Sequence, residues 1–173
     1  MIEVKSICIS DLRELWEISY GSKADLQWMK FNGPYFKDSV QSWEDFSVKF
    51  DRENKAIILS DEKIIGLLTA HFEDGNLEKW LEFGICIYDS KLWGKRIGQN
   101  VLPVWISQLF DQYPEIQRLG FTTWSGNPGM MKLGEKLGMK EEARIRKVRY
   151  WKDEYYDSVK YGILRDEWFE KEN

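Results

Sequence analysis

The sequence predicts an α/β protein built on one mixed sheet. Apolar segments at 56–59, 64–72 and 80–88 are joined by short turns, which is typical of an antiparallel meander. A long helical pattern then separates the segment 80–88 from the strand-like segment 118–124. Strands joined by a helical crossover are parallel, so the sheet should be mostly antiparallel with one parallel pair.

The first half of the chain predicts a strand, two helices and a hairpin. Residues 2–9 form the expected first strand, and Asp11 with Glu14 three residues later predicts a capping box at the start of a helix. The aromatic segment 21–38 lacks a steady period; most of it should pack, with one or two residues reaching a pocket. Ser42 is the expected N-cap of the second helix, and residues 60–63 form the hairpin turn.

The second half predicts two helices that alternate with strands. Ile97, Val101 and Trp105 recur at helical spacing in a helix over 97–110. Asn127 followed by Pro128 predicts the start of a short helix, which should end at Gly138. Strands are expected over 143–151 and 156–164, and the end of the chain, 165–173, is polar. The composition is uniform, which predicts a single domain over 1–173.

Composition limits the partners. The chain has 173 residues and a net charge of −4, which argues against a nucleic-acid partner bound through bulk charge. No segment is long and apolar enough to predict a membrane span, and no signal peptide is recognisable, so the cytoplasm is the default location. Cysteine and histidine lack the spacing of metal ligands, so no metal is expected. The aromatic content of 15% is compatible with a homodimer, without indicating a surface.

The loop 89–99, between the strand 80–88 and the helix 97–110, is the strongest functional signal. Gly94 and Gly98 allow close approach of the backbone to an anion, while Lys95 and Arg96 add positive charge. The start of the following helix adds its partial positive charge. A phosphate or pyrophosphate site is one interpretation. The alternative is a helix start with a solvated basic turn, because short glycine motifs often occur by chance.

The order of these motifs resembles the GNAT acetyltransferase superfamily. The motifs are Trp93-Gly94-Lys95, the helix end Glu135-Lys136-Leu137-Gly138, and the tail from Tyr150 through Trp168. Within the superfamily the chain is similar to the RimJ/RimL branch, the ribosomal-protein N-terminal acetyltransferases. The resemblance implies a GNAT-like fold, a mostly antiparallel sheet with a central parallel pair and helices on both faces. It also implies acetyl-coenzyme A (acetyl-CoA) as donor and a primary amine, on a peptide N-terminus or a small molecule, as acceptor.

The resemblance also assigns cofactor-binding positions. The pyrophosphate loop of the family corresponds to Trp93, Gly94, Lys95, Arg96, Ile97 and Gly98, with Gln99 next to it. Arg96 replaces the central glycine of the family pattern. Asn127 matches the family asparagine expected near the pantetheine arm. Backbone N–H groups near Ile85 or Ile87 would stabilise the oxyanion, since this strand splays from its parallel neighbour in the family.

Glu82 is the preferred candidate for the base that takes a proton from the amine. A free lysine-type amine, with a pKa of about 10.4, is almost wholly protonated at neutral pH, so a base is needed. Glu82 lies between Leu81 and Phe83, and a carboxylate among apolar neighbours has a raised pKa. The alternative places Glu82 on a solvated strand face. Glu73 and Glu78 are weaker candidates.

The general acid is where the sequence departs from the family. Many relatives carry a tyrosine at the position of Gly134, which has no proton to donate. Tyr150 is the candidate acid here, with Tyr155, water or departure of the thiolate without any acid as alternatives, while Tyr161 should pack in the core. His71, the single histidine, is more often structural in such a strand position.

Three functions from different classes follow. The leading one is an acetyl-CoA-dependent N-acetyltransferase acting on a protein N-terminus, a polyamine or another small amine. The departure at Gly134 keeps open a CoA-binding regulatory protein without turnover. A nucleic-acid-binding module is disfavoured by the acidic balance.

Overall fold

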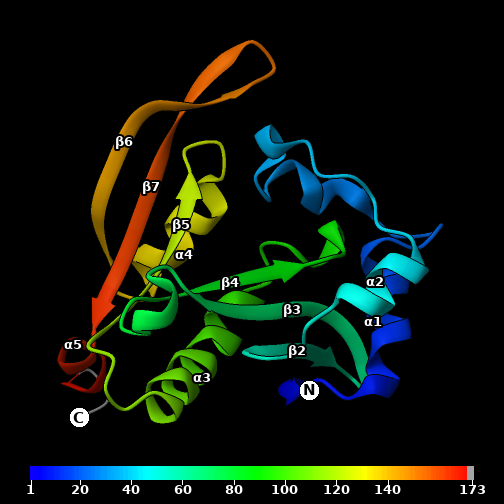
Figure 1. Cartoon of the computed structure of the whole chain (residues 1–173), viewed down its shortest axis with the longest axis horizontal. Coiled ribbons are helices and arrows are strands. Elements are labelled where there is room, and N and C mark those ends of the chain that lie inside the picture. Colours follow the sequence, from blue (N-terminus) through cyan, green and yellow to red (C-terminus); the bar gives the residue numbers. More distant parts are fainter. Residues whose placement is uncertain (171–173) are drawn as a thin grey trace. The chain divides into compact units, whose positions relative to one another are not determined.

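A computed structural model describes residues 1–170 and confirms the predicted fold class (Figure 1). The strands form a seven-stranded sheet in the order β1-β2-β3-β4-β5-β7-β6. The pair β4–β5 is parallel, and β1–β2, β2–β3, β5–β7 and β6–β7 are antiparallel. The strands are β1 Ile2–Ser6, β2 Lys55–Ser60, β3 Lys63–Phe72, β4 Leu81–Ile87, β5 Arg118–Trp124, β6 Lys140–Trp151 and β7 Glu154–Leu164.

The first four of the five helices in the described part of the chain match the expected positions closely. The helices are α1 Leu12–Ser19, α2 Trp43–Lys49, α3 Ile97–Gln112, α4 Pro128–Lys136 and α5 Arg165–Glu170. Two predicted caps are confirmed: Ser42 Oγ accepts the N–H of Asp45 at 3.1 Å, and Asn127 Oδ1 accepts the N–H of Met130 at 3.2 Å. No helix within residues 1–170 combines the length and the apolar character needed to cross a membrane.

The chain divides into two compact units, which we describe separately. Unit 1 comprises Met1–Thr69 and Ile85–Val101. Its core is apolar and draws on α1, α2 and the first strands. Its buried members are Ile7, Leu12, Leu15, Trp28, Phe46, Ile57, Ile64 and Tyr88. The hairpin β2–β3 turns through Asp61 and Glu62, which both have positive φ (49° and 67°), as a two-residue primed turn requires.

Unit 2 comprises Ala70–Gly84 and Leu102–Asn173 and is described as far as residue 170. Strand β5 pairs with β7 over its whole length, from Arg118↔Leu164 to Trp124↔Ser158. Beyond β7 lies the long strand β6, so the β6–β7 hairpin forms one end of the sheet order (Figure 1). The register of the parallel pair covers Leu81↔Leu119 and Glu82↔Gly120.

Two local expectations are corrected. The first strand ends at Ser6, and a 3-10 turn occupies Ile9–Asp11. The capping box predicted from Asp11 and Glu14 does not form at α1. Asp11 Oδ2 accepts the N–H of Cys8 instead, and Glu14 Oε1 accepts the N–H of Ile64, because both carboxylates find other backbone donors.

The polar end of the chain also contains a helix that the sequence analysis did not predict. Helix α5 is amphipathic only through Trp168, which is 6% exposed and donates a hydrogen bond to Ser107. At its start, the Arg165 guanidinium donates to the carbonyl oxygens of Phe110, Tyr113 and Ile116. These carbonyls lie at and beyond the end of α3, where a helix leaves acceptors without partners.

Candidate functional site

A short loop leads from β4 into α3 and carries the residues predicted to bind an anion. A 3-10 turn at Ser90–Leu92 follows β4, and α3 begins at Ile97. Between them Gly94 (φ 74°) and Arg96 (φ 63°) both have left-handed backbone conformation. Alternation of left- and right-handed residues turns N–H groups to one side, as in an anion-binding nest. The positive φ angles of Gly94 and Arg96 are compatible with the predicted phosphate site.

Contacts within unit 1 fix the beginning of this loop. The N–H of Ser90 donates to Asp25 Oδ2 at 2.8 Å, and Trp93 Nε1 donates to the carbonyl oxygen of Ile87 at 2.9 Å. The edge of the Phe31 ring also meets Trp93, with centroids 5.4 Å apart. The Trp93 side chain thus ties the loop to β4 and to the segment between α1 and α2.

The two basic side chains of the loop remain available. Lys95 and Arg96 are exposed, and neither forms an ion pair or a side-chain hydrogen bond within the described residues 1–170. Ile97 is different, because it is only 6% exposed and packs in the core. Gly98 and Gln99 are partly buried in the first turn of α3. Ile97 could therefore offer an anion only its backbone.

Strand β4 presents backbone N–H groups at Ile85 and Ile87. The N–H of Tyr88 donates to the carbonyl oxygen of Ile65 in β3 at 3.1 Å. Because N–H groups alternate in direction along a strand, those of Ile85 and Ile87 should be directed away from β3. This orientation is compatible with the predicted oxyanion donors.

Asp25 is a site residue that the sequence analysis missed. Its carboxylate accepts hydrogen bonds from Ser90 and from the N–H of Gln27, which hold the pKa of Asp25 below its ordinary value. An aspartate that caps a nearby turn is common, and its second partner lies 65 residues away along the chain. No local pattern could have predicted that contact.

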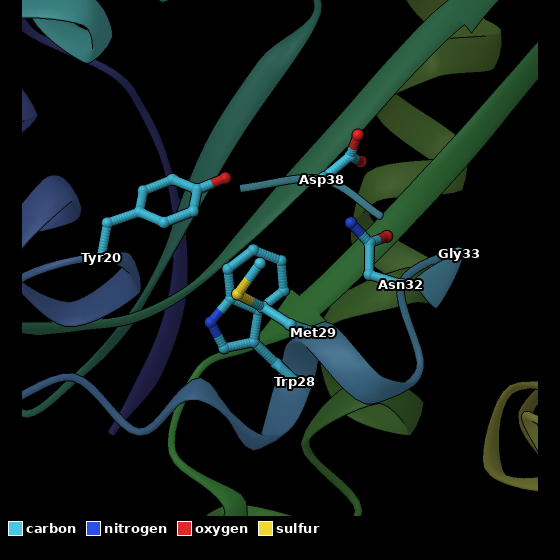
Figure 2. A pocket seen from close by; sticks show the side chains of 6 residues that line it. All are labelled: Tyr20, Trp28, Met29, Asn32, Gly33 and Asp38. Carbon is cyan, nitrogen blue, oxygen red and sulfur yellow. The ribbon is translucent and has the colours of Figure 1, made fainter. Parts of the chain in front are cut away.

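A pocket lies beside the same segment of unit 1. It encloses about 290 Å³, including space open to solvent. Figure 2 shows the Trp28 ring and the Met29 sulfur at its centre, with the Tyr20 hydroxyl and the Asp38 carboxylate nearby. Asn32 and Gly33 complete the lining. Aromatic faces beside a carboxylate suit a cationic group.

Most of the aromatic segment 21–38 was expected to pack, with one or two residues at a pocket, and this is wrong: only Trp28 is buried, Phe31 and Phe36 are exposed, and five residues of the segment line the pocket. Trp28 is 7% exposed and belongs to the core of unit 1, yet it also lines the pocket. Its ring meets Tyr20 edge-on at 5.5 Å and Tyr88 at 5.3 Å. Burial, with Cys86 and Asp38 nearby, raises the pKa of the Tyr20 hydroxyl. The hydroxyl therefore stays neutral at physiological pH.

Glu82 is buried in unit 2, but its surroundings differ from those expected. Its side chain is 1% exposed, so the alternative of a solvated strand face is wrong. The apolar environment expected from Leu81 and Phe83 is also wrong, because neighbours along a strand point to opposite faces. On its own face Glu82 accepts hydrogen bonds from the Thr122 hydroxyl (2.6 Å to Oε2) and Trp80 Nε1 (3.3 Å to Oε1).

Two cations complete the environment of Glu82. Lys160 Nζ lies 3.6 Å and Arg118 Nη1 lies 3.8 Å from Glu82 Oε1. Lys160 also donates to the Thr122 hydroxyl at 2.7 Å. Thr122 and Lys160 were missed by the sequence analysis, since they reach Glu82 only through strand pairing. Of the weaker candidates, Glu73 contacts His71 and has a carboxylate oxygen within 4.8 Å of one of Glu82, whereas Glu78 is exposed.

The packing around Gly134 explains the absence of a tyrosine there. A Cβ atom at this position would lie 2.7 Å from Phe121 Cζ and 3.1 Å from Tyr161 Cδ1. The two rings are stacked, with centroids 5.3 Å apart and an interplanar angle of 11°. Tyr161 is 2% exposed, which confirms its predicted place in the core. Burial raises the pKa of its hydroxyl, with Glu135 and Glu141 adding to the effect.

Tyr150 and Asn127 occupy different settings in unit 2. Tyr150, near the turn between β6 and β7, is 53% exposed and its hydroxyl donates to Asp153 Oδ1 at 3.1 Å. Its neighbour Tyr155 is 64% exposed, and the centroids of the two rings are 4.9 Å apart.

Asn127 Oδ1 caps α4. Its side-chain amide nitrogen is the group left to meet a cofactor.

Comparisons with solved structures support the fold. A spermidine N-acetyltransferase from Vibrio cholerae, in complex with CoA and spermine, is 16% identical with a TM-score of 0.76, and 97% of this chain and 98% of that chain are covered. A GNAT-family acetyltransferase from Bacillus anthracis is 19% identical with a TM-score of 0.75, covering 96% of both chains. At these identities the likeness establishes the fold.

Sequence comparisons establish the family. The SPbeta prophage-derived uncharacterized N-acetyltransferase YokL of Bacillus subtilis (strain 168) is 22% identical over 134 residues, which span 78% of this chain and 74% of that protein. The family model described as an acetyltransferase (GNAT) domain matches residues 3–140. That match covers most of the chain, including the loop before α3 and helix α4. The chain therefore belongs to the GNAT family of acetyl-CoA-dependent acetyltransferases.

Proposed function

We propose that this acetyltransferase moves the acetyl group of acetyl-CoA to a primary amine, with its pyrophosphate site in the loop 93–99. The observation that carries the proposal is the loop itself. It combines left-handed backbone at Gly94 and Arg96 with two exposed basic side chains, Lys95 and Arg96, immediately before α3. Such a loop offers N–H donors, formal charge and a helix N-terminus to one anion. The predicted contribution of Asn127 is to the pantetheine arm.

The proposed acceptor is an amine that binds in its ammonium form. The pocket around Trp28 supports this class, because it presents aromatic faces and the Asp38 carboxylate, with no basic residue in its lining. Resemblance to the RimJ/RimL branch favours a protein N-terminus, and the spermidine N-acetyltransferase with a similar fold makes a polyamine the main alternative. Both acceptors carry the charged amine that the pocket suits.

The proposed chemistry is direct transfer. Glu82 takes a proton from the ammonium group, directly or through a water molecule, and the free amine attacks the thioester carbonyl. The N–H groups of Ile85 and Ile87 stabilise the oxyanion of the tetrahedral intermediate. The C–S bond then breaks, and the departing thiolate takes a proton from the new C–N centre or from Tyr150.

A CoA-binding regulatory protein without turnover is the second candidate. The packing at Gly134 favours it, because Phe121 and Tyr161 leave no room for a tyrosine at the position where many relatives place their acid. The two candidates share the CoA site and differ only in product formation.

Calorimetric titration with acetyl-CoA tests the shared site. We expect affinity in the micromolar range, about −8 kcal/mol, that is lost in Lys95→Glu and Gly98→Asp. Product formation over a panel of peptides, polyamines and small amines then selects between the candidates. Acetylated product that is lost in Glu82→Gln with CoA binding retained supports the enzyme mechanism. Binding without product from any amine favours the regulatory protein, and absence of binding contradicts the proposed loop.

A further inference from the structure

Polar side chains from four adjacent strands meet on one face of the sheet in unit 2. They come from His71 in β3, Glu82 in β4, Thr122 in β5 and Lys160 in β7. Buried polar groups need partners, and a connected set of them on a sheet face is costly unless it is satisfied. The network therefore needs a functional explanation that includes residues other than Glu82.

Glu82 is the central hydrogen-bond acceptor of this network. The Thr122 hydroxyl donates to one carboxylate oxygen at 2.6 Å, while Trp80 Nε1 donates to the other at 3.3 Å. Lys160 and Arg118 lie 3.6 Å and 3.8 Å from that second oxygen. A proton resting on Glu82 would neutralise the partner of two cations at a site that is 1% exposed. Glu82 is therefore better suited to passing a proton on than to keeping it.

His71 is placed to receive such a proton. Its Nε2 lies 2.6 Å from Glu73 Oε1. One ring nitrogen of His71, one carboxylate oxygen of Glu73 and one of Glu82 lie within 4.8 Å of one another. The His71 side chain is 60% exposed and that of Glu73 is 33% exposed. The Glu73 carboxylate thus faces the imidazole, which solvent also reaches. The positive charges of Lys160 and Arg118 are matched by Glu82 and, for Arg118, by Glu142 at 2.6 Å.

A metal ion is the competing explanation for one histidine and two carboxylates. Such a set is chemically able to ligate a divalent cation. However, Lys160 and Arg118 already lie beside Glu82 Oε1, and their charges oppose a third cation at that oxygen.

We propose that His71 is the proton acceptor of the acetyl-transfer reaction, reached through Glu82 and held in orientation by Glu73. This inference rests on the proposed function. The ammonium group of the acceptor gives one proton to Glu82, and a ring nitrogen of His71 takes that proton on while Glu73 keeps its hydrogen bond to the imidazole. The amine lone pair forms the C–N bond, and the C–S bond breaks. The second amine proton leaves with the CoA thiolate, and imidazolium returns the first to solvent.

The test compares variants of the full chain with an amine substrate that the wild type acetylates. We measure kcat/KM across the pH range in which imidazole titrates, together with CoA affinity by calorimetry. His71→Gln should lose about 10²-fold in kcat/KM and lose the acidic limb of the pH profile. Glu73→Gln should lower kcat/KM less than His71→Gln does, because it weakens the orientation of the imidazole without removing it. The exposed Glu78→Gln serves as the charge-matched control and should leave rate, profile and CoA affinity unchanged.

The outcomes separate this inference from the proposed function. A wild type that acetylates no amine contradicts the proposed function itself. An active wild type with an unchanged rate and an unchanged acidic limb in His71→Gln overturns the role of His71 alone. Loss of wild-type activity on chelation, restored by a divalent metal, would also overturn it in favour of a metal site. Retained CoA affinity in His71→Gln shows that the variant is folded, so its lost rate then supports the proposal.

Discussion

The backbone N–H of Ser90 donates a 2.8 Å hydrogen bond to the carboxylate of Asp25, so the segment between α1 and α2 holds the turn that precedes the basic loop. The same segment lines the pocket through Trp28 and Met29. Phe31 reinforces the connection by its edge-on contact with Trp93. The proposed acceptor pocket and the proposed CoA loop of unit 1 are thus mechanically connected through a few residues.

The substitution Asp25→Asn should therefore weaken CoA binding, although residue 25 is not proposed to contact the cofactor. The neutral amide is a poorer acceptor for the Ser90 N–H, so the loop is less ordered before binding. We expect the Kd for acetyl-CoA to rise about three- to tenfold by calorimetry. The matched control is Asp38→Asn, which removes the same charge from the same segment without a contact to the loop. It should keep the CoA affinity and raise the KM for the amine; equal CoA affinity in both variants would contradict the coupling.

The pH dependence of stability provides a second check on Asp25. Its hydrogen bonds hold the pKa of the folded state below the ordinary carboxyl value. A depressed pKa contributes stability that is fully present above the unfolded-state pKa of about 3.9 and is lost as the pH falls through the folded-state pKa. The difference in unfolding free energy between wild type and Asp25→Asn should thus be largest near neutral pH and shrink in acid. A difference that is constant down to strongly acidic pH would show that the carboxylate charge is irrelevant.

Arg96 allows the backbone and the charge of the loop to be separated. Its φ of 63° lies in the left-handed region that favours glycine. Arg96→Gly should keep the loop conformation and remove only the guanidinium, whereas Arg96→Ala removes the charge and keeps the strain. We expect acetyl-CoA affinity to fall about tenfold in both, with a weaker dependence on salt than in the wild type. Thermal stability should be higher in Arg96→Gly than in Arg96→Ala, and the reverse order would contradict the assigned strain.

Gly134 should be intolerant of even a methyl group. A Cβ there meets Phe121 Cζ at 2.7 Å and Tyr161 Cδ1 at 3.1 Å, and both rings are buried. Gly134→Ala should lower the unfolding free energy by about 1–3 kcal/mol, measured by denaturant titration. Because the clash is with Phe121, the same substitution should cost less in a Phe121→Leu background. An equal cost in both backgrounds would place the strain elsewhere.

The sequence analysis succeeded where the signal is local. Hairpin turns, the crossover helix and the caps at Ser42 and Asn127 depend on residues close together in the chain, and all are confirmed. The capping box at Asp11 was wrong because Glu14 accepts the N–H of Ile64, which is 50 residues away. Helix α5 was missed because its stability comes from Trp168 and from Arg165 contacts with distant carbonyls.

The candidate site shows the same division. The loop 93–99 is contiguous, so its residue types and its position before a helix are visible in the sequence. The environment of Glu82 is not, because Thr122 and Lys160 reach it across paired strands. Leu81 and Phe83, its neighbours along the chain, belong to the opposite face and misled the expectation. Which residues share a sheet face depends on register, and register could not be derived from one sequence.

Asn127 has two separable roles, and its substitution is the sharpest test of the cofactor assignment outside the loop. Its Oδ1 caps α4 through the N–H of Met130, and the amide nitrogen is proposed to meet the pantetheine arm. Asn127→Ala should cost about 1 kcal/mol of stability, as should the matched cap variant Ser42→Ala in α2. Asn127→Ser restores a capping oxygen, so stability should return. Acetyl-CoA affinity should stay low in Asn127→Ser and be unaffected in Ser42→Ala. If Asn127→Ser recovers both properties, Asn127 acts only as a helix cap, and the pantetheine arm needs another partner.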